Sequence, residues 1–342
     1  MLASRLMESA FGGVPNNVAP ELLSKYTCED GATLIAMESA EDIRDIFFDS
    51  VYTMEALEFE RERATMEGAS EDVMEAIGEK IKTNAKAAIS TIKTKLKQLW
   101  EKVKGFTKNV KTRLLSIFQN ASKFAKNNRD MLKKLDLAGF EYEVFPYRIE
   151  NTCNKMTTAI KTESDSAITY VGTLIKNPEN GEEREDLRGD GSGQYRDNYG
   201  LMLKSSFGGS DKEEDVTKYI WGQLRGGVQY GADKEQKTGD INEIVDALIG
   251  APKLIKSFDS TWSKQDDMFK KAITKCNEGE RLDTGKYPHL VKTFQQLHTL
   301  ITKYSNLFNK VIGQAKSAVD EMIGDYMRVV RKALRYKPAK KD

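Results

Sequence analysis

The chain has 342 residues, 31% of them charged, and its mean hydropathy is −0.56. No apolar run approaches the roughly 18 residues that a membrane-spanning helix needs, and the N-terminal Met1–Glu8 is too short and polar for a secretory signal. The three cysteines lie far apart without a C-x-x-C pair, so neither a disulfide framework nor a zinc ribbon is indicated, and a reducing intracellular setting fits best. We therefore expect a soluble protein with a substantial core.

The overall net charge of +1 conceals two opposite charge blocks. Residues 1–79 contain 5 Lys or Arg against 18 Asp or Glu, a net charge of −13. Residues 80–134 contain 16 Lys or Arg against 2 Asp or Glu, a net charge of +14. This asymmetry indicates that the basic block meets a polyanion, a membrane surface or an acidic partner. The alternative is that the two blocks neutralise each other within the chain.

One helix is predicted before the basic block. Glycines and prolines interrupt residues 1–38, whereas Ser39 followed by acidic residues is typical of a helix N-cap and first turn. The apolar spacing that follows predicts a helix over about 40–66. The sequence Gly68-Ala-Ser70 then marks a break.

The basic block has the most regular pattern in the chain, because its apolar residues recur in steps of three and four. The pattern predicts a helix over 80–126 with one buried side, including Ile92, Leu96, Val103, Val110 and Ile117. If unbroken from 80 to 134, it would be about 80 Å long. An interruption at Gly105, giving a helix hairpin, is the compact alternative.

The middle of the chain changes character twice. Alternating aromatic residues over 139–147 predict a short extended segment, ended by Pro146. A helix is then expected over about 149–175. Residues 181–240 hold 12 of the 25 glycines and are predicted to be rich in loops. One short helix is expected there, opened by a capping box that starts at Ser210.

Two long helical stretches close the chain. The first is predicted over about 240–278, with a break at Gly250-Ala-Pro252, and the second over about 288–335. The segment from Arg328 to Lys341 contains seven Lys or Arg residues. Helices of this length bury their apolar stripes against one another or against another subunit.

Together these elements predict a mainly α fold, in which long amphipathic helices form a bundle-like arrangement with a short extended segment and a Gly-rich insertion. We divide the chain into an N-terminal segment (1–38), an acidic then basic helical region (39–136), an extended segment plus helix (137–180), a Gly-rich loop region (181–240) and C-terminal long helices with a basic tail (241–342).

No motif indicates catalysis, and we expect no catalytic, cofactor-binding or metal-binding residues. The two histidines, His289 and His298, lack the spacing of a metal-ligand pair. The stretch from Asp186 to Asp197 loosely resembles a calcium-binding loop. However, it places Arg188 at a ligand position, which favours an ordinary turn. We therefore expect a non-enzymatic protein without cofactors.

The basic helix has three interpretations. Its lysines form the solvated face of a bundle, or they contact nucleic acid through phosphates, or they lie on a membrane surface with Trp100, Phe106 and Phe118 as anchors. The narrow apolar stripe suits helix packing better than a membrane. The candidate polyanion-binding residues are Lys93, Lys97, Lys104, Lys108 and Lys111.

The order of these segments carries a family resemblance. A Met-Glu-rich acidic region is followed by a Lys-rich amphipathic helix that ends Phe124-Ala-Lys-Asn-Asn-Arg-Asp-Met-Leu-Lys134, and then by Gly139-Phe-Glu-Tyr-Glu-Val-Phe-Pro-Tyr147. This order resembles internal head or other virion structural proteins of large tailed bacteriophages, over roughly residues 35–150. Leu6-Met-Glu8 and Ala36-Met-Glu38 are similar to sites cut by phage head-maturation proteases.

The resemblance implies a virion protein, located in the phage head and in the cytoplasm of the infected cell before assembly. Its implied partners are other virion proteins, further copies of the chain, and DNA or an acidic protein, with processing after Glu8 and Glu38. The alternative function is a peripheral membrane-binding or host-interaction protein that uses the helix over 80–126.

Overall fold

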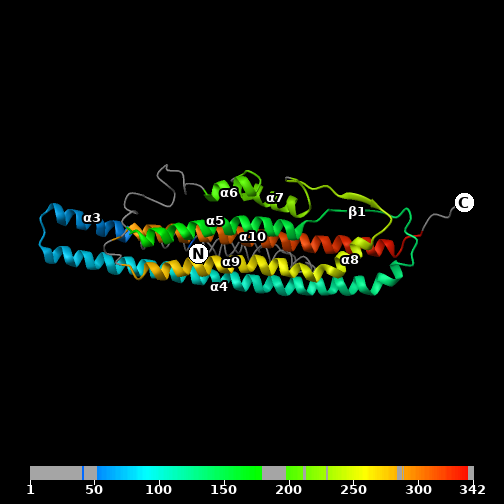
Figure 1. Cartoon of the computed structure of the whole chain (residues 1–342), viewed down its shortest axis with the longest axis horizontal. Coiled ribbons are helices and arrows are strands. Elements are labelled where there is room, and N and C mark those ends of the chain that lie inside the picture. The colour runs from blue at the N-terminus through cyan, green and yellow to red at the C-terminus, as the bar shows by residue number, and fades with distance from the viewer. Residues whose placement is uncertain are drawn as a thin grey trace, which may run out of the picture.

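A computed structural model of the chain describes residue 41 and residues 52–178, 198–210, 213–228, 230–282, 287 and 289–337. Helices make up 81% of these residues, which confirms the predicted mainly α fold. The molecule is a long rod with its helices lying along the rod axis (Figure 1). The predicted N-cap at Ser39, the candidate processing sites Glu8 and Glu38, and the stretch from Asp186 to Asp197 lie outside the described residues.

The described elements, in chain order, are α3 (Tyr52–Met66), α4 (Glu71–Leu132), β1 (Glu141–Val144), α5 (Ile149–Lys176), α6 (Asn198–Ser206), α7 (Glu213–Leu224), β2 (Glu235–Thr238), α8 (Asn242–Gly250), the 3₁₀ helix η3 (Ala251–Leu254), α9 (Ile255–Gly279) and α10 (His289–Ala333). The helices predicted over 149–175 and 288–335 are confirmed. The predicted break at Gly250-Ala-Pro252 is also confirmed, because η3 separates α8 from α9.

The long helices α4, α5, α9 and α10 form the body of the rod (Figure 1). Helices α4 and α10 run in one direction, and α5 and α9 run in the other. Ion pairs between neighbouring helices agree with this arrangement. Lys93 of α4 pairs with Glu280, just after α9, and Lys111 of α4 pairs with Asp259 of α9. The later lysine thus pairs with the earlier carboxylate, so α4 and α9 are antiparallel. Helix α9 therefore joins α4 on one side to α5 on the other.

Helix α10 is the central helix, because it packs against α4, α5, α7, α8 and α9. In the middle turns of α10, polar side chains are buried as well as apolar ones. The side-chain amide Nε2 of Gln265, on α9, donates to the backbone oxygen of Ser305 (3.3 Å) and to Oδ1 of Asn309 (3.1 Å). Lys316 is only 1% exposed and pairs with Asp320 at 2.5 Å. These contacts satisfy only part of the buried polar groups, because Gln265 Oε1, Asn309 Nδ2 and Asp320 Oδ1 are buried without a hydrogen-bond partner among the described residues.

Helix α4 is continuous over 62 residues, so the predicted interruption and the hairpin alternative are wrong. Gly105 lies on the exposed face, where an added Cβ would meet nothing within 4 Å, and the buried stripe continues on both sides of it through Val103 and Phe106. Packing of this stripe therefore outweighs the modest helix cost of one glycine. Of the five residues predicted to be buried, Ile117 is only partly buried, and the other four are buried: Ile92, Leu96, Val103 and Val110. Beyond Val110 the buried stripe continues in steps of four, to Leu114 and Phe118. This places Ile117 at the edge of the stripe.

Helix α3 folds back along the start of α4 and forms a hairpin at one end of the rod (Figure 1). The predicted break is confirmed, because Gly68 turns the chain with φ +69°, a conformation that favours glycine. This end has a small core of its own, made of Met54, Ala64, Ile77, Ile81, Ala85, Ala88 and Val291.

The predicted extended segment contains β1, which pairs antiparallel with β2, from Glu141 opposite Thr238 to Val144 opposite Glu235. The sequence did not indicate β2, because its residues Glu-Gln-Lys-Thr are polar and do not alternate with apolar ones. The described part of the Gly-rich region therefore holds more secondary structure than predicted, since α6, α7 and β2 all lie within it. Helices α6 and α7 cover α5 and α10 (Figure 1).

One hydrophobic cluster joins most of the described elements, from Ile89 on α4 to Ala333 on α10. It includes residues of each region that the sequence analysis separated between 39 and 342. The bundle is therefore assembled from helices far apart in the chain, which share one core.

Candidate polyanion-binding surface

Helix α4 carries its basic residues on the faces opposite its apolar stripe. The steps of three and four between buried residues leave the outward positions to lysine and arginine, whose long side chains keep their charges in water. The exposed basic residues of the helix are Lys80, Lys86, Lys97, Lys102, Lys104, Lys108, Lys123, Lys126 and Arg129. We call the outward positions of α4 between Lys97 and Lys126 the basic face.

The structure divides the five lysines predicted to bind a polyanion into two groups. Lys93 and Lys111 point to the flank of α4 and pair with carboxylates of the α9 segment, Glu280 at 2.5 Å and Asp259 at 2.6 Å. Lys93 is largely covered, with 18% of its side chain exposed. Both residues connect helices within the bundle, but Lys111 remains 42% exposed and is therefore less committed to its partner than Lys93.

Lys97, Lys104 and Lys108 lie on the basic face. Lys97 and Lys108 are exposed and form no ion pair with the described residues. The ammonium of Lys104 lies 3.5 Å from the ring centroid of Trp100 and 2.8 Å from the carboxylate of Glu101. Because this last pair is exposed and joins residues on one helix, it competes weakly with a bound anion.

A basic cluster at the end of the rod opposite the α3–α4 hairpin was not predicted from the sequence (Figure 1). Helices α4 and α10 run in the same direction, so their basic C-terminal turns meet. The guanidinium of Arg331 lies 5.4 Å from the ring centroid of Phe124, the residue that follows Lys123 in the sequence. Lys126 and Lys332 are also exposed at this end. Both charge runs are visible in the sequence, but only the packing of α10 beside α4 brings them together.

Some of the basic residues at this end already have acidic partners. Arg129 pairs with Asp246 of α8 at 3.2 Å, and Arg328 pairs with Asp325 at 2.9 Å. Basic residues near helix C-termini also interact favourably with the helix dipole. The end cluster therefore has a structural role as well as a positive surface.

The ion pairs of α4 bear on the question of whether the acidic block (1–79) neutralises the basic block (80–134). In the described part of the chain, cross-helix ion pairs join α4 to α8 and to the α9 segment, through Asp246, Asp259 and Glu280. One pair also crosses the boundary between the blocks within α4, where Lys82 lies 3.0 Å from Glu79. The acidic residues before position 41 and between 42 and 51 lie outside the described residues.

The apolar residues proposed as membrane anchors lie inside the bundle. Phe106 and Phe118 are buried in the main hydrophobic cluster. Trp100 is partly buried, and its Nε1 donates to Asp266 of α9 at 2.7 Å. In this fold the apolar stripe of α4 packs against other helices, so the membrane alternative would depend on its lysines alone. Among the described residues, no helix is long and apolar enough to cross a bilayer.

Two cysteines and one histidine of the described residues have defined surroundings. Burial raises the pKa of the Cys153 and Cys276 thiols to about 12, which keeps them protonated and poorly nucleophilic at neutral pH. His289 lies 3.0 Å from the backbone oxygen of Pro178 through Nε2. No group of three or more His, Cys, Asp or Glu side chains in the described part of the chain is arranged to hold a metal ion.

Comparison with known proteins adds no identity to these observations. The chain matches no protein-family model, no curated protein and no solved structure. Its function is therefore inferred from the geometry and charge of the bundle.

Proposed function

We propose that this chain is a non-enzymatic structural protein that binds nucleic acid through its phosphates along the basic face of α4. The observation that carries the proposal is the row of exposed lysines on one unbroken helix, including Lys97, Lys104, Lys108, Lys123 and Lys126. From Lys97 to Lys126 the helix rises by roughly 45 Å.

The lysines of the basic face are spaced unevenly, by 7, 4, 15 and 3 residues, but they lie on one continuous helix, and binding to phosphates does not need an exact match of spacing. Duplex DNA carries a charge about every 1.7 Å along its axis, so a row of lysines gains counterion release without reading any base. The basic face offers no recognisable base-reading module, and we expect binding to be independent of sequence.

The setting that we propose is the head of a tailed phage, where the rod packs against other virion proteins or further copies of the chain and meets packaged DNA or an acidic protein. This part rests on the family resemblance of residues 35–150. If Glu8 and Glu38 are processing sites, the mature chain begins at Ser9 or Ser39, which N-terminal mass spectrometry of the particle-derived chain would detect. A mature chain that begins at neither residue would contradict processing at these sites.

DNA binding is tested by fluorescence anisotropy with a labelled duplex over a series of salt concentrations. We expect the affinity of the full chain to fall steeply with salt, because each phosphate contact contributes a slope of about −0.9 in log–log terms. Replacing Lys97, Lys104 and Lys108 together by Gln should flatten the slope by up to about 2.7.

A matched control removes the same number of exposed lysines elsewhere. Lys155 on α5, Lys253 on η3 and Lys256 on α9 are exposed, and their triple replacement by Gln changes the net charge equally. We expect it to leave most of the slope intact. Equal effects of the two triple variants would contradict binding along α4. No DNA binding at low salt would reject the proposed function, and binding to anionic vesicles instead would favour the membrane alternative.

A further inference from the structure

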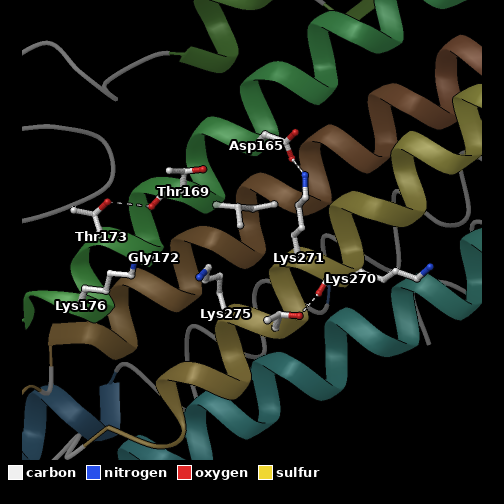
Figure 2. Close-up of a pocket in the computed structure, with 10 residues that line it drawn as sticks. Asp165, Thr169, Gly172, Thr173, Lys176, Lys270, Lys271 and Lys275 are labelled. Atoms are coloured by element: carbon white, nitrogen blue, oxygen red, sulfur yellow. Dashed lines mark hydrogen bonds and ion pairs between the residues drawn. The ribbon is translucent and has the colours of Figure 1, made fainter.

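A second charged feature lies between α5 and α9, around the last turns of both helices. Here the two helices border an open groove of about 580 Å³, a size typical of small-molecule sites (Figure 2). Its walls are mainly lysine and threonine, whereas most ligand pockets are lined by apolar side chains. The lining therefore suits a polar, anionic ligand.

Two of the lysines in the groove are already engaged. Lys271 pairs with Asp165 of α5 at 2.9 Å and with Asp267 at 2.8 Å. Lys270 pairs with Asp266 at 2.6 Å, and its side chain extends away from α5 toward α4 (Figure 2). These two residues shape the groove but contribute little uncompensated charge.

The other two lysines flank Gly172 (Figure 2). Lys176 follows Gly172 by one helical turn on the same face of α5, is exposed, and forms no ion pair with the described residues. Lys275 reaches across from α9, and a Cβ added to Gly172 would lie 3.1 Å from its Nζ. Its carboxylate partner is Glu278, at 2.7 Å on the same helix and 38% exposed. Lys275 therefore covers Gly172, and its ammonium group and that of Lys176 border the same part of the groove (Figure 2).

Two threonines in the groove can accept hydrogen bonds but have no free proton to donate. The hydroxyl of Thr173 donates to the backbone oxygen of Thr169 at 3.2 Å, and that of Thr274 donates to the backbone oxygen of Lys270 at 2.8 Å. A hydroxyl has one proton and two lone pairs, so both oxygens remain as acceptors. Each oxygen can therefore accept a hydrogen bond from a ligand hydroxyl.

We propose that this groove binds a small phosphorylated polyol, with its phosphate held between Lys176 and Lys275 and its hydroxyls donating to Thr173 and Thr274. The absence of a side chain at Gly172 makes room for Lys275, whose Cε and Nζ lie 3.0 and 3.1 Å from the place of a Cβ. This site is separate from the basic face of α4 and does not depend on nucleic-acid binding.

The test is isothermal titration of the full chain with glucose 6-phosphate, inorganic phosphate and glucose as probes. We expect glucose 6-phosphate to bind more tightly than inorganic phosphate, and glucose not to bind. Lys176→Gln and Lys275→Gln should each weaken glucose 6-phosphate binding by roughly tenfold, because each removes a charge-assisted hydrogen bond. Thr274→Val should weaken glucose 6-phosphate but not inorganic phosphate.

Lys256→Gln is the matched control, since Lys256 is an exposed lysine of α9 outside the groove. It should bind like the unmodified chain. An equal loss in this control would overturn the site in favour of general electrostatic attraction. No binding of either phosphate probe at millimolar concentration would also overturn it, and equal affinity for the two probes would overturn the polyol assignment. Lys176→Gln keeps the test independent of folding, because Lys176 is exposed.

Discussion

The inner and outer sides of α4 contribute differently to the stability of the fold, although they belong to one continuous helix. On the inner side, Leu96 is fully buried among residues of the main cluster. On the outer side, the adjacent Lys97 is exposed. Burial of apolar area stabilises the fold, whereas exposed charges contribute little to stability. The comparison separates the residues that hold the bundle together from those that remain available to a partner.

The largest expected effect is on the inner side. Leu96→Asp should destabilise the bundle by roughly 4 kcal/mol or more, because it places an unpaired carboxylate in the core and removes apolar contacts. Lys97→Asp is the matched control, since it introduces the same residue one position away on the exposed side, and it should change stability by about 0.5 kcal/mol or less. Urea unfolding followed by far-UV circular dichroism measures both. Similar losses in the two variants would contradict the assigned orientation of α4.

A smaller effect is expected on the flank between the two sides. The pair of Lys93 and Glu280 is largely covered and joins two helices, whereas the pair of Lys104 and Glu101 is exposed and lies within one helix. A double-mutant cycle with Gln substitutions should give a coupling energy of about 1 kcal/mol for the first pair and below about 0.5 kcal/mol for the second. Equal coupling energies would show that burial does not distinguish these pairs.

The smallest effect should be a gain in stability on the outer side. Gly105→Ala should stabilise the chain by about 0.5–1 kcal/mol, because alanine favours the helix and its Cβ meets no neighbour. Gly279→Ala provides the contrast at the end of α9, where the added Cβ would overlap the ring of Phe294. It should destabilise by roughly 1–3 kcal/mol. Thermal unfolding of the two variants should therefore shift in opposite directions, and a loss of stability in Gly105→Ala would contradict an open outer side.

Much of the helical framework could be predicted from the sequence, because the apolar spacing that defines a helix is local. The continuous stripe of α4, the turn at Gly68 and the break at Pro252 all depend on residues within a few turns of one another. The strand β2 could not be predicted in this way. Its polar residues become a strand only because β1, nearly a hundred residues earlier, supplies the hydrogen-bonding partner.

The candidate sites show the same division. Sequence alone determined that α4 has one apolar side and several basic ones, since both follow from its helical period. Only the tertiary structure decided that Lys93 and Lys111 face carboxylates of the α9 segment while Lys97 and Lys108 face solvent. The groove around Gly172 likewise exists only where α5 and α9 meet. The physical reason is that charge pairing and cavities depend on which surfaces approach in space, and hydrophobic packing of distant segments sets that approach.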